Sequence, residues 1–254
     1  MKVLAIANNK GGCGKTTTAD HLSYLLSAQK IRTLMIDLDP QANLTQRYLL
    51  DVAVDDPAWP AKTIADVLGG AVEGVEMGKA LFHVQTNLWL ATSEFQLANV
   101  ALGLLYDAVR GRTALQRALR TPAVQGQFDL VIIDTPPEAG ILLVNALLAA
   151  DGVLLPAEPE GDAVAGVKRV VEMVDHIRTE FDRDRPIILG AVATRVDTRT
   201  NRHKDGLEIM RKSLLAPLRS TIPERNGEAR ETALQEAYGH LAKMISKWAG
   251  GQYA

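Results

Sequence analysis

Residues 10–17 read Lys10-Gly11-Gly12-Cys13-Gly14-Lys15-Thr16-Thr17 and follow a short apolar run, Val3–Ala7. The apolar run predicts a buried strand, and leucines at helical spacing within Thr17–Gln29 predict a helix directly after the glycines. Glycines at such a junction let backbone N–H groups turn inward around an anion, and the helix N-terminus adds partial positive charge. The order of strand, glycine-rich loop and helix therefore predicts a phosphate-binding loop rather than a glycine turn with chance lysines.

The rest of the chain alternates short apolar runs with helical patterns. Further buried strands are predicted at Thr33–Ile36, Leu88–Ala91, Leu130–Ile133, Val153–Leu155 and Ile187–Val192. A second helix is predicted at Ala163–Phe181, and loops at Asp51–Pro60 and Gly69–Gly78. This alternation predicts an α/β fold with a doubly wound, mainly parallel sheet and helices on both faces. We expect residues 1–254 to form a single domain of this kind.

Composition and charge exclude several classes of protein. The net charge of −2 excludes a basic surface over the whole molecule, so contact with nucleic acid would need a local patch. Because Cys13 is the only cysteine, an internal disulfide and a four-cysteine metal cluster from one chain are excluded, which fits a reducing cytosol. The N-terminal apolar run is too short for a signal peptide, and no apolar stretch approaches the roughly 18 residues that span a bilayer. We therefore expect a cytoplasmic protein.

The phosphate-binding loop departs from the standard pattern at its first position. The pattern G-x-x-x-x-G-K-[ST] opens with a glycine, but here that position is Asn9, and Lys10 follows it. Within the loop, Lys15 is expected to reach the β- and γ-phosphates of a nucleotide and the Thr16 hydroxyl to bind Mg²⁺. The hydroxyl of Thr17 is expected to lie near the α-phosphate.

Two predicted strands end in carboxylates that complete such a site. Asp37 and Asp39 are two residues apart, so an extended chain places them on one face, at the carboxyl end of the sheet where ligands bind. The alternative is that Asp39 is a turn aspartate before Pro40. Asp134 ends the apolar run Leu130–Ile133, which is the Walker B arrangement, and is expected to hold magnesium directly or through water. Two prolines stiffen the segment that follows it.

Together these motifs resemble the ParA/MinD group of P-loop ATPases, and the resemblance covers nearly the whole chain. The loop has the deviant Walker A form KGGxGK[ST], so Gly11, Gly12, Cys13, Gly14, Lys15, Thr16 and Thr17 are implied to bind ATP. In this group the early lysine, here Lys10, reaches across a dimer interface to the partner's nucleotide and neutralises charge during transfer. The segment Asp37–Gln41 looks like the ParA switch motif DxDPQ, which implies that Asp39 positions the attacking water and Asp37 supports the magnesium shell.

Two looser matches concern the nucleotide base. The resemblance places base contacts after a strand, at Asp197, and packs a proline on adenine, here Pro223 of Ile222-Pro223. A strand-ending aspartate and a turn proline are also common without such a role.

Residues 195–230 carry a local excess of positive charge. They contain nine Lys or Arg and five Asp or Glu, a net charge of +4, whereas the rest of the chain carries −6. Such an excess can form a patch that binds phosphates. Arg199-Thr200-Asn201 looks like the RTN sequence of ParA proteins, so Arg199, Arg225 and Arg230 are the candidates for contact with non-specific DNA. The alternative is an ordinary solvated helix face.

The resemblance implies a homodimer that sandwiches ATP and Mg²⁺, binds nucleoid DNA and hydrolyses ATP slowly until a ParB-like or other adaptor stimulates it. One alternative is a MinD-like ATPase that binds the membrane through a C-terminal amphipathic helix. There Leu241, Met244, Ile245 and Trp248 form one apolar face, although such a face more often packs on the protein's own core. Another alternative is a metabolic P-loop enzyme such as a small-molecule ligase, which leaves Lys10 less well explained. The cargo and the adaptor are not named by the sequence.

Overall fold

The computed structural model describes the chain except for residues 53–55, 57, 71–75, 108–109, 123, 161–162, 214–216, 225–227 and 252–254. The side chains of residues 163–164, 213, 218 and 228–231 also lie outside the description.

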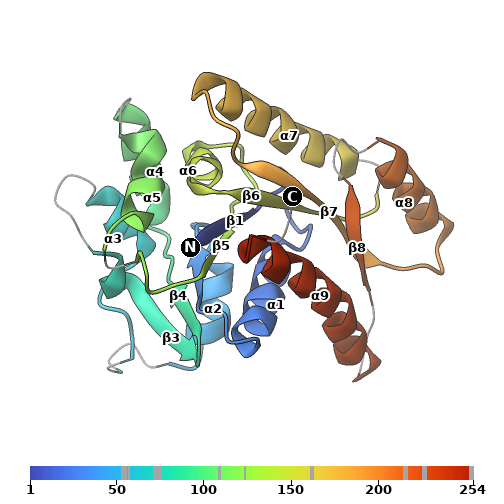
Figure 1. The fold of residues 1–254 in the computed structure, drawn as a ribbon, viewed down its shortest axis with the longest axis horizontal. Coiled ribbons are helices and arrows are strands. Elements are labelled where there is room, and N and C mark those ends of the chain that lie inside the picture. The colour runs from blue at the N-terminus through green and yellow to red at the C-terminus, as the bar shows by residue number, and fades with distance from the viewer. Residues whose placement is uncertain are drawn as a thin grey trace.

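Within the described part, eight strands form one sheet in the order β3-β4-β2-β5-β1-β6-β7-β8 (Figure 1). In chain order the strands are β1 (Lys2–Ile6), β2 (Thr33–Asp37), β3 (Leu81–Gln85), β4 (Leu88–Ala91), β5 (Leu130–Asp134), β6 (Gly152–Ala157), β7 (Ile187–Val196) and β8 (Leu218–Pro223). Neighbouring strands are parallel except for β3 and β4, which are antiparallel. The prediction of a doubly wound, mainly parallel sheet is confirmed.

The apolar runs predicted the six inner strands but not β3 and β8, which lie at the two edges of the sheet. The residues of β3 are half-buried or exposed, and β8 mixes Arg, Ser and Thr with its apolar residues. Edge strands cover less core than inner strands, so their sequences lack the continuous apolar run that marks a strand buried on both faces.

Helices cover both faces of the sheet. They are α1 (Lys15–Ala28), α2 (Asn43–Leu49), α3 (Ile64–Gly69), α4 (Leu97–Tyr106), α5 (Ala114–Leu119), α6 (Ile141–Ala149), α7 (Ala163–Glu180), α8 (Asn201–Ser213) and α9 (Glu228–Ala249), with short 3₁₀ turns η1 (Met77–Ala80) and η2 (Gly111–Thr113). Figure 1 shows α6 and α7 on one side of the sheet and α1 and α9 on the other. Predicted helices 17–29 and 163–181 correspond to α1 and α7. The described residues of 51–60 form neither helix nor strand, as predicted, but α3 and η1 enter the predicted loop 69–78 at its ends.

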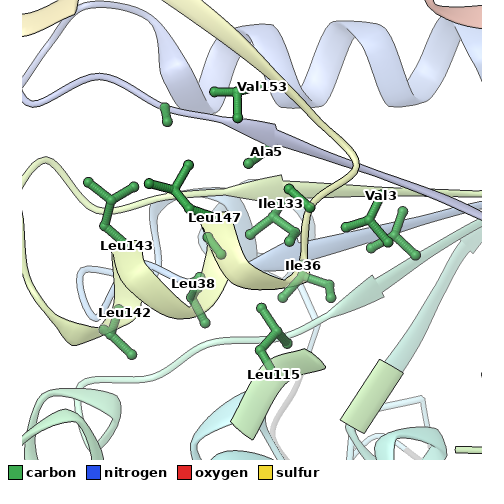
Figure 2. Close-up of a cluster of buried hydrophobic side chains, with 14 of the residues drawn as sticks. Val3, Ala5, Ile36, Leu38, Leu115, Ile133, Leu142, Leu143, Leu147 and Val153 are labelled. Carbon is green, nitrogen blue, oxygen red and sulfur yellow. The ribbon is translucent and has the colours of Figure 1, made fainter. Parts of the chain in front are cut away.

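Alternate residues of the central strand β1 build the two halves of the core. Val3 and Ala5 pack in the cluster under α6 and α7, whereas Leu4 and Ile6 pack with α1 and α9. This follows from the two-residue period of a strand. Figure 2 shows the first cluster, where Leu143 and Leu147 of α6 lie over the strands.

The apolar face of the C-terminal helix is part of this core. Leu241, Ile245 and Trp248 of α9 are buried against α1 and the sheet, and Met244 is partly buried there. The sequence left two possibilities for this face, membrane binding and packing on the protein's own core. In the structure it packs on the core. Within the described part of the chain, none of the helices combines the length and apolar character that crossing a bilayer requires.

Candidate nucleotide-binding site

The phosphate-binding loop connects the end of β1 to the start of α1. Gly12 and Gly14 have φ values of 75° and 84°, which L side chains rarely adopt. A Cβ atom at Gly14 would also lie 3.2 Å from the side chain of Thr194, so glycine is required there for two reasons. Gly14 is the N-cap residue and provides no side chain to cap α1, and the first turn holds no acidic residue. The first N–H groups of α1 are therefore available to an anion.

Lys15 lies buried over this loop. Its Nζ donates a hydrogen bond of 2.9 Å to the carbonyl oxygen of Lys10 and lies 4.0 Å from the Cys13 Sγ. No described carboxylate forms a salt bridge with Lys15, so the loop holds a buried positive charge that an anion can neutralise. Burial raises the pKa of the Cys13 thiol, which therefore stays protonated at neutral pH.

Asp134 is a buried carboxylate without a hydrogen-bond partner in the described part of the chain. Both of its oxygens are inaccessible to solvent and unpaired. Burial and the nearby Asp37 carboxylate raise the pKa of Asp134 to about 8. The nearby Thr16 hydroxyl and Lys15 ammonium oppose this rise in pKa. Neither group, however, meets the distance and angle that a hydrogen bond to the carboxylate requires. The ionised form of this buried carboxylate is costly without partners, which is why its proton is held to a high pH; a divalent cation would stabilise the ionised form and displace the proton.

Asp37 lies on the neighbouring strand, directly opposite Asp134. Its Oδ2 accepts hydrogen bonds of 2.8 Å from both the backbone N–H and the hydroxyl of Thr45, at the start of α2. Burial raises the pKa of Asp37 to about 6, although the two hydrogen bonds from Thr45 act in the opposite direction. Asp37 is thus held in one orientation, whereas the oxygens of Asp134 accept no hydrogen bond from a described residue.

Asp39 follows the end of β2 and is 8% exposed. Its Oδ1 accepts a 2.9 Å hydrogen bond from the backbone of Gln41, and its own carbonyl accepts one from the Ser93 hydroxyl. The pKa of Asp39 is raised, first by burial and also by the negative charge of Glu138, while Lys15 lowers it. Sequence reasoning missed Glu138, which follows the two prolines after Asp134 and carries no local signal of its role.

The expected base contacts, Asp197 and Pro223, line one pocket of about 710 Å³. Among the described residues, Val196, Thr198, Arg199, Thr221 and Glu224 also line it. The Asp197 carboxylate accepts hydrogen bonds from the Nε, NH2 and backbone N–H groups of Arg199, at 2.8, 2.8 and 3.0 Å. The Arg199 guanidinium therefore holds the pKa of Asp197 well below its usual range. The sequence assigned Asp197 to the nucleotide base and Arg199 to DNA. In this structure the two residues are paired with each other.

The structure describes only part of the remaining expected contacts, those of Arg225 and Arg230 with DNA and of Thr17 with the α-phosphate. Arg225 lies outside the described residues, and so does the side chain of Arg230, which belongs to α9. The Thr17 hydroxyl accepts a 3.1 Å hydrogen bond from Arg47, so it is already engaged. The roles assigned to these three residues remain predictions.

The site brings together the loop lysine, the Thr16 hydroxyl and three carboxylates at the carboxyl ends of β1, β2 and β5. A glycine-lined anion cradle beside an unpartnered carboxylate and a hydroxyl is the donor set that a magnesium–nucleoside triphosphate requires. The residues present therefore fit Mg²⁺ and ATP. Sequence reasoning did not find Thr45, which binds Asp37, or Thr194, whose hydroxyl donates a hydrogen bond to the carbonyl of Cys13 from 181 residues away.

Comparisons with known proteins show the family to which the chain belongs. A family model described as an AAA domain matches residues 1–187. The chain is 31% identical to the sporulation initiation inhibitor protein Soj of Bacillus subtilis over 244 residues, covering 96% of this chain and 90% of that protein. It is 32% identical to the chromosome partitioning protein ParA of Caulobacter vibrioides over 201 residues, covering 79% of this chain and 72% of that protein.

Among solved structures, the cobyrinic acid a,c-diamide synthase of Mycobacterium smegmatis, with a bound ATP analogue and magnesium, is similar at a TM-score of 0.84 and 32% identity. That likeness covers 99% of this chain and 97% of the other. The fold, the phosphate-binding loop with its early lysine, the two strand-end carboxylates and the relatives agree: the chain belongs to the ParA family of P-loop ATPases.

Proposed function

We propose that this protein is a Mg²⁺-dependent ATP hydrolase that dimerises on ATP, binds non-specific DNA and positions or segregates a DNA or protein cargo. An adaptor of the ParB kind stimulates its slow intrinsic hydrolysis, and the dimer acts in the cytoplasm on the nucleoid. The observation that carries the proposal is the glycine cradle of residues 11–14 beside the unpartnered carboxylate of Asp134.

Each group of the site has a part in this activity. The loop N–H groups and the Lys15 ammonium bind the phosphates, while the Thr16 hydroxyl and Asp134 hold the metal ion. Mg²⁺, when bound, neutralises the charge on the phosphate oxygens. Asp39 orients the attacking water, since no described residue donates a hydrogen bond to its Oδ2. Lys10 forms no salt bridge with a described residue, so its ammonium is available to a nucleotide on a second subunit.

ATP is the switch because its γ-phosphate alone contacts both the segment that follows Asp37 and the segment that follows Asp134. A ligand shifts an equilibrium only through contacts that differ between the two states, and ADP lacks this contact. Hydrolysis therefore separates the dimer and releases DNA. The positive excess of residues 195–230, with Arg199, Arg225 and Arg230, supplies the phosphate contacts on DNA.

The test uses the full chain with ATP, ADP or no nucleotide. ATP with Mg²⁺ is expected to give hydrolysis, a doubled mass by light scattering and salt-sensitive binding to DNA of arbitrary sequence. With ADP, neither the doubled mass nor the DNA binding is expected. Asp134→Asn is the control for hydrolysis. A chain that ignores ATP, neither binding it nor changing its self-association, refutes the proposal.

A second candidate function is an ATP-dependent small-molecule ligase. The likeness to a cobyrinic acid diamide synthase over almost the whole of both chains favours it. A ligase would release phosphate or pyrophosphate from ATP only when a carboxylic acid and a nitrogen donor are present. Hydrolysis stimulated by DNA and an adaptor, without such substrates, would exclude this candidate.

A further inference from the structure

Asn9 occupies the position where the standard loop pattern has a glycine, and its side chain makes two contacts outside the loop. The Nδ2 donates a 2.8 Å hydrogen bond to the carbonyl oxygen of Pro137, three residues after Asp134. The Oδ1 accepts a 3.0 Å hydrogen bond from the NH1 of Arg169 on α7. Only one orientation of the amide satisfies a carbonyl on one side and a guanidinium on the other. Asn9 does not have a positive φ, so the backbone does not require glycine here.

We propose that Asn9 and Arg169 form a positioning pair that joins the entry of the phosphate-binding loop to the segment after Asp134. By fixing where Lys10 and Lys15 lie, this pair sets the rate of ATP hydrolysis. This inference rests on the proposed function and concerns the same site. Arg169 forms no salt bridge with a described residue, which leaves its guanidinium to the loop.

The neighbouring contacts show how closely α7 and the loop entry are packed. Asn8 is fully buried, and its Nδ2 donates a 2.6 Å hydrogen bond to the carbonyl of Pro156 at the end of β6. A Cβ atom on Gly166 of α7 would lie 2.3 Å from the Asn8 Oδ1 and 3.6 Å from the Lys10 Cβ. The backbone of α7 therefore rests directly on residues 8–10, and the loop entry is fixed to three separate segments of the chain.

A shift of Asn9 reaches the lysines through one peptide. The carbonyl of Lys10, the next residue, accepts the hydrogen bonds of the Lys15 Nζ at 2.9 Å and the Cys13 Sγ at 3.2 Å. When the segment after Asp134 responds to the γ-phosphate, the bond from Asn9 to Pro137 carries that movement to the loop. The glycine of the standard pattern has no side chain and cannot make this connection.

The experiment is a double-mutant cycle on the full chain with Asn9→Ala, Arg169→Ala and the double variant. We expect each single variant to lower kcat by about tenfold while the Kd for a non-hydrolysable ATP analogue changes by less than about threefold. The double variant should be no slower than Asn9→Ala, because residues of one network are not additive. Arg169→Lys, which keeps a donor for Asn9, should recover most of the rate. Lys168→Ala is the matched control, since Lys168 is an exposed cation on the same helix and pairs with Glu172.

Three results would each overturn the inference. They are rates of both single variants within twofold of wild type, additive losses of kcat in the double variant, and a loss of nucleotide affinity as large as the loss of kcat. Melting temperatures are measured alongside, and a slow variant with a large drop in Tm counts as structural and against it. A wild-type protein that does not hydrolyse ATP would overturn the proposed function and this inference with it. Hydrolysis by the wild type with unchanged variants overturns the inference alone.

Discussion

Asp37 and Asp134 lie directly opposite each other at the carboxyl ends of the adjacent parallel strands β2 and β5. Asp37 is held by Thr45, and neither oxygen of Asp134 has a partner among the described residues. Two buried carboxylates side by side destabilise the protein without its ligand and prepare it to bind a divalent cation.

The stability of the nucleotide-free protein should fall as pH rises. The folded state holds the proton of Asp134 up to a pKa of about 8, whereas an unfolded Asp releases it near pH 3.9. Between these values the folded state binds more protons, so the free energy of unfolding decreases with pH, and Asp134 alone contributes at most about 1.4 kcal/mol per unit of pH. Asp134→Asn should flatten this decrease and be the more stable protein at pH 8.5. Thermal melts from pH 5 to 8.5 check it, and equal slopes for the two proteins would contradict it.

Replacing Asp39 by alanine should trap the ATP-bound dimer. The variant keeps the loop and the metal ligands but loses the group that orients water, so hydrolysis should fall by about 10²-fold or more. Light scattering with ATP should then show a dimer that outlasts the wild-type dimer. Normal hydrolysis by this variant would mean that Asp39 does not position the water.

Replacing Lys10 by alanine should separate binding from hydrolysis. Lys15 and the loop backbone still bind ATP, so the Kd should change by less than about threefold, whereas hydrolysis should be lost because the cross-subunit charge is missing. Mixing Lys10→Ala with a subunit that has Lys10 but cannot bind ATP offers a direct check. Recovered hydrolysis in the mixed dimer supports action across the interface, and the absence of recovery opposes it.

Replacing Gly14 by alanine should abolish nucleotide binding. The φ of 84° is strained for alanine, and its Cβ would press on Thr194. Gly126→Ala is the matched control, because Gly126 has a φ of 85° but open space around it. Both variants should lose about 1–2 kcal/mol of stability from the backbone, but only Gly14→Ala should lose ATP binding by calorimetry. Retained binding in Gly14→Ala would contradict the geometry of the cradle.

Replacing Arg199 by alanine should weaken DNA binding and leave ATP binding in place. If Arg199 leaves Asp197 to contact a phosphate, the dependence of log K on log salt should lose about one unit of slope. Arg202→Ala, which removes an exposed cation paired with Glu160, is the comparison. An unchanged slope, with a changed affinity for ATP, would place Arg199 in the base pocket instead of on DNA.

The sequence predicted the parts of the site whose signals are local. Residues 10–17 stand next to one another in the chain, and the apolar runs before Asp37 and Asp134 mark buried strands that end at the same edge of a parallel sheet. The edge strands β3 and β8 escaped because they are only partly covered by the core. The pairing of Asp197 with Arg199 escaped for another reason: each residue type also fits a different ligand, and the sequence does not show which partner lies nearer.

The sequence by itself determined the fold class, the phosphate-binding loop and the carboxylates that join it, since strand, turn and helix signals depend on neighbouring residues. Only the tertiary structure decided which carboxylate has no partner among the described residues, that the apolar face of α9 is covered, and that Asn9 is hydrogen-bonded to Arg169 and Pro137. The contact of Asn9 with Arg169 joins residues 160 positions apart, and α9 packs on α1, at the other end of the chain. Packing brings them together, and no local pattern in the chain records which distant groups will meet.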